Sequence, residues 1–252
     1  MDSQRHAGRT AVVTGAGSGI GRATVIRLAQ EGAHVVGCDI DEAALSVTRG
    51  ELVAAGLQAS LEQVDVTNQA DIDRLLVAIS EPVDLLANVA GIMDHFVPLS
   101  EVDDSSWERV LSVNLTGVMR LTRAVLPGMQ QAGSGAIVTV ASEASLRAGA
   151  AGAAYTTSKH AVIGLVKHVA YFYGPLGIRS NAVLPGAVAT GIGASSVPTS
   201  EWAMERAMAA LATMGSVAEP GQIASAISWL GCDEASNING AIMTADGGWS
   251  TA

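Results

Sequence analysis

Short apolar runs and amphipathic segments follow one another along the whole sequence. The runs do not alternate apolar and polar residues, which is typical of parallel strands buried on both faces. We expect such strands at residues 10–13, 34–38, 84–87, 136–140, 178–184 and 241–244. The amphipathic segments predict helices at residues 21–30, 70–79, 105–130, 155–173 and 219–230.

This alternation predicts an α/β fold with a doubly wound parallel sheet and helices on both faces. A further strand is expected to end at Asp65 and Val66, which makes seven strands. No repeat or linker interrupts the pattern, so we expect one domain over residues 1–252. The alternation of strands and helices is interrupted only at residues 187–216, which become helical around Trp202. We expect a substrate lid there, and the alternative is a surface loop.

Composition and charge narrow the function. Hydrophobic residues make up 49% and charged residues 15%, which excludes a disordered chain. The net charge of −10 argues against nucleic acid as a partner, because neutralising phosphates needs basic patches. No apolar stretch approaches the roughly 18 residues of a membrane span, and the first residues show no signal segment. We therefore expect a cytoplasmic protein without membrane contact. Neither the two distant cysteines nor any other spacing predicts a metal site.

A glycine-rich turn, residues 14–21, joins the first strand to the first helix. Glycines let the backbone approach a pyrophosphate, and the helix start offers free N–H groups. The alternative is a turn that serves packing alone. The expected contacts come from Gly15, Ser18, Gly19, Ile20 and Gly21.

Asp39 ends the second strand, where a carboxylate can bind both hydroxyls of an adenosine ribose. It would repel the 2′-phosphate of NADP(H), and neither Ser18 nor Ile40 supplies a compensating positive charge. NAD(H) is therefore favoured over NADP(H). The alternative is that Asp39 caps the next helix.

Polar and small residues also stand at later strand ends. Asp65 and Val66 end the third strand, and Asn88, Ala90 and Gly91 follow the fourth. Ligands of open α/β sheets bind at this edge, so these residues are expected to contact the cofactor. Ordinary turn chemistry is the alternative.

Tyr155 and Lys159 are four residues apart in a predicted helix and share one face. An ammonium beside a phenol favours the phenolate, so this pair predicts an acid/base group. Ser142, at the end of the fifth strand, could meet the same substrate oxygen.

Together these motifs resemble the short-chain dehydrogenase/reductase family over essentially the whole chain. The family pattern TGxxxGxG fits residues 14–21, and Asn-x-Ala-Gly fits 88–91. The resemblance assigns a catalytic tetrad to Asn114, Ser142, Tyr155 and Lys159. It assigns nicotinamide-side contacts to Pro185, Gly186, Val188 and Thr190. Val89 and Ala141 depart from the usual pattern, at positions that carry no chemistry.

The resemblance implies a Rossmann-like fold and hydride transfer between a nicotinamide and a carbonyl or alcohol carbon. Tyr155 would take the hydroxyl proton, and Ser142 would hold the substrate oxygen. Lys159 would lower the pKa of Tyr155 and bind the nicotinamide ribose. Asn114 would place a water that links Lys159 to solvent. Relatives pair their long helices across a two-fold axis, so a homotetramer is expected.

The substrate pocket is expected to be mostly apolar. Glu143 could select a polar group, and a solvent-facing or salt-bridged role is the alternative. His95 could touch the substrate, although a lone histidine is more often structural. The candidate pocket residues are Met93, His95, Glu143, Ala144, Leu146, Ile192 and Trp202.

Three functions follow from these residues. The first is an NAD-dependent dehydrogenase or ketone reductase for an apolar small molecule, cyclic compounds included. The second is a 3-oxoacyl-carrier-protein reductase, which Asp39 and the negative charge disfavour. The third, from another class, is a nucleotide-binding regulator without turnover, which the intact tetrad disfavours.

Overall fold

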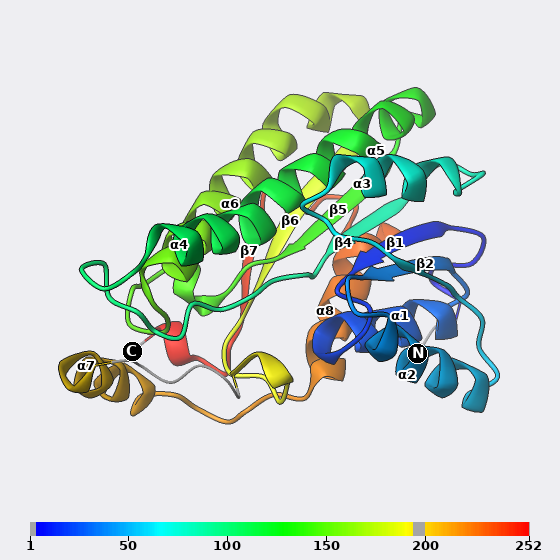
Figure 1. The fold of residues 1–252 in the computed structure, drawn as a ribbon. Helices are drawn as coiled ribbons and strands as arrows, with labels where there is room; N and C mark the ends of the chain where they lie inside the picture. The colour runs from blue at the N-terminus through cyan, green and yellow to red at the C-terminus, as the bar shows by residue number, and fades with distance from the viewer. Residues whose placement is uncertain (1–3, 194–199, 252) are drawn as a thin grey trace.

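The computed structural model describes residues 4–193 and 200–251, and it contains one sheet of parallel strands (Figure 1). The strand order is β3-β2-β1-β4-β5-β6-β7, which reverses direction between β1 and β4. The doubly wound, seven-stranded sheet predicted from the sequence is confirmed. The strands are β1 (Thr10–Thr14), β2 (His34–Asp39), β3 (Ser60–Gln63), β4 (Leu85–Asn88), β5 (Gly135–Val140), β6 (Ile178–Pro185) and β7 (Ile242–Ala245).

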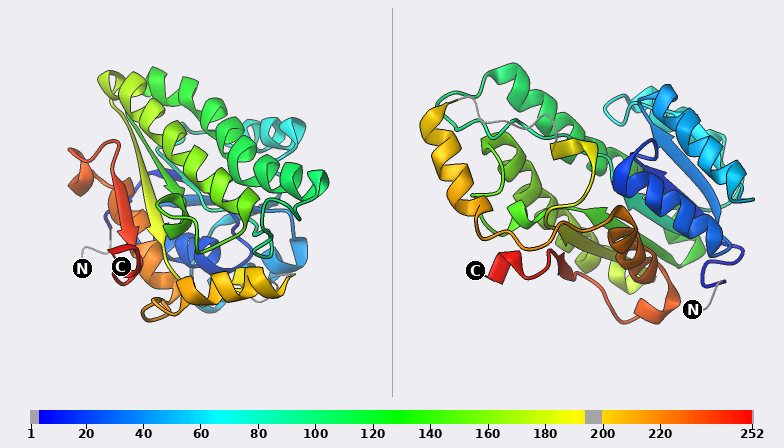
Figure 2. Two further views of the ribbon diagram at one scale, coloured as in Figure 1. Left: turned by 90° about the vertical axis from the view of Figure 1, so that its left-hand side faces the viewer. Right: turned by 90° about the horizontal axis from the view of Figure 1, so that it is seen from below.

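Helices cover both faces of the sheet. Side chains alternate between the faces along each strand, so Ala11 and Val13 of β1 join one buried cluster and Val12 joins the other. Helices α1, α2 and α8 pack on the first face, and α3, α5 and α6 pack on the second. Figure 2 shows α1 and α8 side by side below the sheet. The helices are α1 (Gly19–Gln30), α2 (Glu42–Ala54), α3 (Gln69–Val77), α4 (Asp104–Leu111), α5 (Val118–Ala132), α6 (Ala153–Tyr173), α7 (Glu201–Leu211) and α8 (Pro220–Gly231).

Two predicted elements differ in detail. The third strand ends at Gln63 rather than at Asp65, and it is a polar edge strand with one buried residue, Leu61. The long helix expected at 105–130 is divided by a π-helical turn, Ser112–Gly117, which separates α4 from α5.

The expected lid contains a short 3-10 turn, Gly191–Gly193, and helix α7. Residues 194–199 of that segment lie outside the described residues. In the part of the chain that the structure describes, no helix is long and apolar enough to cross a membrane.

Candidate active site

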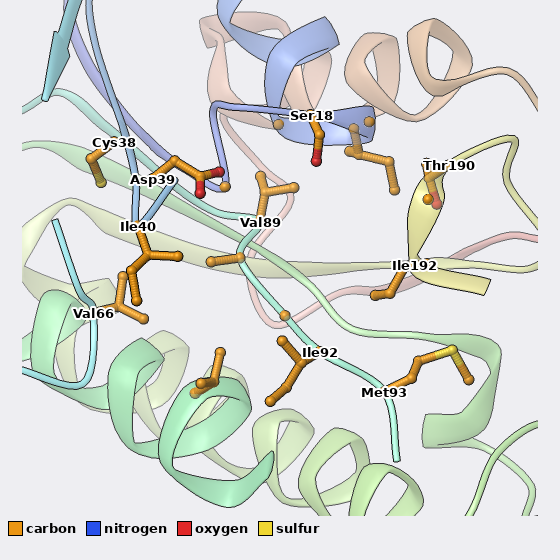
Figure 3. A pocket seen from close by; sticks show the side chains of 18 of the residues that line it. Ser18, Cys38, Asp39, Ile40, Val66, Val89, Ile92, Met93, Thr190 and Ile192 are labelled. Carbon is orange, nitrogen blue, oxygen red and sulfur yellow. The ribbon is translucent and has the colours of Figure 1, made fainter. Parts of the chain in front are cut away.

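A pocket of about 510 Å³ opens at the carboxyl edge of the sheet, where the strand order reverses. This is the place where ligands bind in doubly wound folds. Figure 3 shows Asp39 and Ile40 at one end of the pocket, and Thr190, Ile192 and Met93 at the other. The predicted residues that line it are Gly15, Ser18, Gly19, Ile20, Gly21, Asp39, Ile40, Asp65, Val66, Ala90, Gly91, Met93, His95, Thr190 and Ile192.

Four other residues predicted to contact the cofactor do not line this pocket and contact other parts of the fold. Asn88 is buried and donates to the Thr122 hydroxyl over 3.2 Å. Pro185 pairs with β7 in the sheet, and Val188 forms a bridge to Ala218. Gly186 packs so closely that a Cβ there would lie 2.9 Å from the Cβ of Asp246.

The glycine-rich turn is shaped by close backbone approach. A Cβ on Gly21 would lie 1.9 Å from the carbonyl oxygen of Gly15, so no other residue fits. A Cβ on Gly19 would lie 2.8 Å from the Thr190 methyl, which brings the loop after β6 against the turn. The N-cap residue of α1, Ser18, makes no side-chain capping bond within the described chain. The first N–H groups of α1 are therefore available to an anion.

Asp39 is tied to the glycine-rich turn. Its Oδ2 accepts from the Gly17 N–H over 2.9 Å, and its Oδ1 accepts from the Asp41 N–H over 3.0 Å. Asp41, not Asp39, caps α2 by accepting from the Ala44 N–H over 3.1 Å. The helix-cap alternative for Asp39 is therefore wrong, and its carboxylate lies in the pocket wall.

Tyr155 lies in the first turn of α6, next to Ser142, which follows the end of β5. Its side chain is buried, and it is hydrogen-bonded to Ser142. Burial raises the pKa of Tyr155 to about 12, the Ser142 bond opposes this rise, and the charge of Asp94 adds to it.

Lys159 follows one turn later on the same face of α6. Its Nζ donates to the Val140 carbonyl over 2.9 Å and lies 5.5 Å from the centroid of the Tyr155 ring. Burial lowers the pKa of Lys159 to about 8. The lowered pKa expected for Tyr155 is thus not seen in this structure, because burial disfavours the charged form of both side chains.

Asn114 is fully buried in the π-helical turn. Its Oδ1 accepts from the Ile92 N–H and its Nδ2 donates to the Ile92 carbonyl, each over 2.9 Å. The Nδ2 also donates to the Ser158 hydroxyl over 3.2 Å. Asn114 therefore joins α6 to the segment after β4, and π-helical turns are often found at functional sites.

The tetrad adjoins the pocket along the segment that follows β4. Gly91 lines the pocket, and a Cβ there would lie 3.3 Å from Asn114 Oδ1 and 3.4 Å from Lys159 Nζ. Tyr155 packs in one cluster with Ile92 and Met93, which also line the pocket.

The remaining substrate-pocket candidates lie outside this pocket. Glu143 is buried and ion-paired with Arg147. Of the two alternatives for this residue, the salt-bridged role describes it and the solvent-facing role does not. Ala144 is buried beside Tyr155, and Leu146 is half exposed. The Trp202 indole donates to Glu101 over 3.2 Å.

Sequence reasoning missed several residues of the site. Asp94 is buried and contacts the start of α6, and Arg109 and Val113 line the pocket from α4 and the π-helical turn. No motif points to Asp94. Arg109 and Val113 stand five residues and one residue before Asn114, spacings that do not share its helical face, and no motif points to them either. Among the described residues, no group of three or more His, Cys, Asp or Glu could hold a metal ion.

A glycine-rich turn and a pocket at the switch point of a parallel sheet define the architecture of dinucleotide-binding oxidoreductases. A family model described as Enoyl-(Acyl carrier protein) reductase matches residues 15–250. A 3beta-hydroxysteroid dehydrogenase 2 of Eggerthella lenta is 41% identical, with 99% of each chain covered. A cis-4-hydroxycyclohexanecarboxylate dehydrogenase of Sinomonas cyclohexanicum is 40% identical, with 98% of each covered.

One solved structure, a 3-oxoacyl-[acyl-carrier protein] reductase from Brucella melitensis with bound NAD, is 30% identical with a TM-score of 0.87. It covers 100% of this chain, which covers 95% of that one. The chain belongs to the short-chain dehydrogenase/reductase family. The resemblance expected from the motifs is confirmed, and the fold is one that binds a nicotinamide cofactor.

Proposed function

We propose that this protein is an NAD(H)-dependent dehydrogenase that interconverts a secondary alcohol and a ketone on an apolar, cyclic small molecule. The observation that carries the proposal is the contact of Tyr155 with Ser142, with Lys159 one turn away beside the pocket. The relatives support the substrate class, since two of them are named for a hydroxysteroid and a hydroxycyclohexane acid.

The pocket residues fit a nicotinamide dinucleotide. The α1 start and the glycine turn would hold the pyrophosphate, and Asp39 would bind the adenosine ribose. At the other end, Gly91 leaves a cradle against Lys159 Nζ that any side chain would fill. Similar solved structures include one with bound NAD and one with bound NADP, so the preference for NAD(H) rests on Asp39.

A bound nicotinamide supplies the hydride acceptor or donor. The Tyr155 phenol exchanges the proton of the substrate oxygen, and Ser142 holds the same oxygen. Lys159 brings a positive charge over the Tyr155 ring, and it stays mostly protonated below its pKa of about 8. Asn114 fixes Ile92 and Ser158 around this group, and the water relay that the resemblance assigns to it is part of the proposal.

The substrate would enter between the segment after β4 and the loop after β6. Ile92, Met93 and Ile192 give this end of the pocket an apolar lining. An apolar lining of this kind suits a cyclic hydrocarbon skeleton with one oxygen at Tyr155. Trp202 belongs to the proposed lid at residues 187–216 and would contact the substrate when the lid closes. Leu146, which follows the turn after β5, stays a proposed substrate contact.

We also propose a cytoplasmic homotetramer. Tyr171 and Phe172 on α6 are 78% and 59% exposed, which gives this helix an apolar face. Sedimentation at micromolar concentration tests the assembly, and a stable monomer would contradict it.

The test of function is absorbance at the reduced-nicotinamide band with a panel of cyclic alcohols and ketones, each run with NAD(H) and NADP(H). We expect turnover with NAD(H). Tyr155→Phe should lower kcat by roughly 10²- to 10⁴-fold, the usual contribution of a general acid/base, and leave cofactor binding nearly intact. Tyr173→Phe, the same change at the far end of the same helix, is the matched control.

Two results would contradict the proposal. Near-wild-type rates for Tyr155→Phe would remove the acid/base assignment. Turnover of a 3-oxoacyl thioester with NADPH, but of no cyclic alcohol, would favour the 3-oxoacyl-carrier-protein reductase for which a similar solved structure is named.

A further inference from the structure

The first turn of α6, which carries Tyr155, is capped by a distant part of the chain. Its N-cap residue, Gly152, has no side chain to satisfy the free N–H groups of a helix start. Asp94, between β4 and α4, supplies the acceptors. Its Oδ1 accepts from the Gly152 N–H over 3.0 Å, and its Oδ2 accepts from the Tyr155 N–H over 2.8 Å. One buried carboxylate therefore holds the backbone of Tyr155 itself.

The backbone after Asp94 is bent to make this contact. His95 and Phe96 have φ values of 55° and 57°, in the left-handed region that residues other than glycine rarely adopt. The bend returns Val97 to α6, where its carbonyl accepts from the Ala153 N–H over 3.0 Å. Two consecutive strained residues thus serve one docking contact.

The fit between this segment and α6 leaves no spare room. A Cβ on Gly152 would lie 2.5 Å from the Val97 nitrogen and 2.6 Å from both Asp94 oxygens. The position of Tyr155 relative to Ser142 is therefore coupled to the place of Asp94. The negative charge of Asp94 also acts on the phenol, in the direction that disfavours the phenolate.

We propose that Asp94 is a positioning residue that fixes the place of Tyr155 through its backbone and sets the charge that the phenol experiences. The importance of this for catalysis rests on the proposed function. The capping geometry itself does not.

The test compares the wild type with Asp94→Asn, Asp94→Glu and Asp103→Asn. Asp103 caps α4 by accepting from the Ser106 N–H over 2.8 Å, so its substitution is the same change at an exposed helix start. The first readout needs no turnover: ultraviolet absorbance follows tyrosinate formation with pH, and the Tyr155→Phe protein supplies the signal of the other two tyrosines.

We expect Asp94→Asn to move the ionisation of Tyr155 to lower pH, because a neutral amide no longer opposes the phenolate. Asp94→Glu should keep the ionisation near its wild-type pH but misplace the helix. With cyclic alcohols, both variants should lower kcat by about tenfold or more, since small displacements of reacting groups are costly. Only Asp94→Asn should shift the acid limb of the plot of kcat against pH. Asp103→Asn should change neither readout.

Circular dichroism and thermal unfolding show whether each variant is folded, and Asp94→Ser replaces Asp94→Asn if the amide prevents folding. A folded Asp94→Asn protein that loses thermal stability but keeps the wild-type ionisation of Tyr155 would overturn the proposal. If the wild type turns over no substrate, the proposed function fails, while the tyrosinate titration still decides the role of Asp94.

Discussion

Asp39→Asn is the substitution that tests the cofactor preference most directly. The amide is isosteric and keeps one oxygen, which can still accept from the Gly17 N–H that now lies 2.9 Å from Oδ2. The glycine-rich turn should therefore keep its shape, and only the charge and one acceptor are lost. This separates the electrostatic role of Asp39 from its structural one.

The expected change in cofactor preference is the sum of two energy terms. A hydrogen bond from a ribose hydroxyl to a charged group contributes about 1.5–3 kcal/mol, part of which the amide loses. The repulsion of a 2′-phosphate at contact distance is about 1 kcal/mol per charge in water and about 4 kcal/mol at an effective dielectric constant of 20. Asp39 is only half buried, so we take about 2 kcal/mol for each term. Together they predict a fall of roughly 10²- to 10³-fold in the NAD-over-NADP ratio of kcat/KM.

The assay is the initial rate of nicotinamide reduction at varied NAD and NADP with one alcohol at a saturating concentration. Asp41→Asn is the control. It removes the same charge only two residues from Asp39, from the carboxylate that caps α2. A change in the ratio of less than about threefold, or an equal change in both variants, would show that Asp39 does not set the preference.

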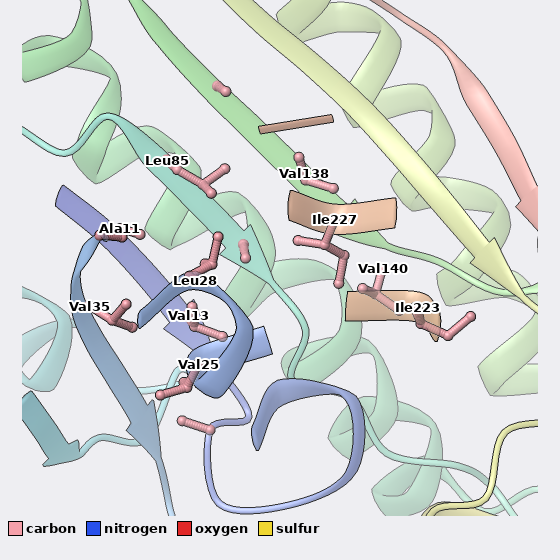
Figure 4. Packing of buried hydrophobic residues seen from close by; sticks show 14 of the residues in the cluster. Ala11, Val13, Val25, Leu28, Val35, Leu85, Val138, Val140, Ile223 and Ile227 are labelled. Atoms are coloured by element: carbon pink, nitrogen blue, oxygen red, sulfur yellow. The ribbon is translucent and has the colours of Figure 1, made fainter. Parts of the chain in front are cut away.

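Two further predictions concern stability. Leu28→Ala removes a fully buried side chain of α1, which Figure 4 shows among Val13, Leu85 and Ile227, and should lower the free energy of unfolding by about 2–5 kcal/mol in urea. Val53→Ala, at a 74% exposed position, should change it by less than about 0.5 kcal/mol, and equal effects would contradict this core. Burial lowers the pKa of His6, so stability should fall as pH drops below about 6.5, by at most about 1.4 kcal/mol per pH unit. His6→Gln should flatten this fall and His34→Gln should not, whereas an unchanged slope in His6→Gln would assign it to other groups.

The sign for His6 follows from its surroundings. Its Nε2 lies 3.1 Å from the Ser228 carbonyl and 3.7 Å from a Glu31 oxygen, both of which favour the protonated form. Burial is the larger influence, and the charges of Arg9 and Arg5 add to it. The unfolded chain therefore binds the proton more readily, and protonation favours unfolding.

The sequence predicted the parts of the molecule that depend on local pattern. The apolar run at 136–140 became β5, and the spacing of Tyr155 and Lys159 placed both on one face of α6. The edge strand β3 was placed less well, because a strand with one partner and an exposed face carries polar residues. The contact of Asp94 with α6 depends on left-handed backbone at His95 and Phe96, which no local pattern encodes.

The burial of Glu143 shows the same limit. A glutamate after a strand end gives no sign of being buried, and its ion pair with Arg147 forms only when the turn after β5 folds back. Arg147 in turn stacks 5.1 Å from the ring of Trp249, near the other end of the sequence. Such long-range contacts decide the surroundings of a charged side chain, and composition cannot anticipate them.

The π-helical turn at Ser112–Gly117 places α4 and α5 out of register with a continuous α-helix. A π-helical turn closes its hydrogen bonds over one residue more than an α-helical turn does, so deleting one residue from it would let α4 and α5 join in a continuous α-helix while each keeps its buried face. The same deletion would remove the wide turn from which Asn114 holds the backbone of Ile92, after β4. The extra residue therefore serves the active site rather than the packing of α5, and we expect a one-residue deletion here to leave a folded protein with a damaged site.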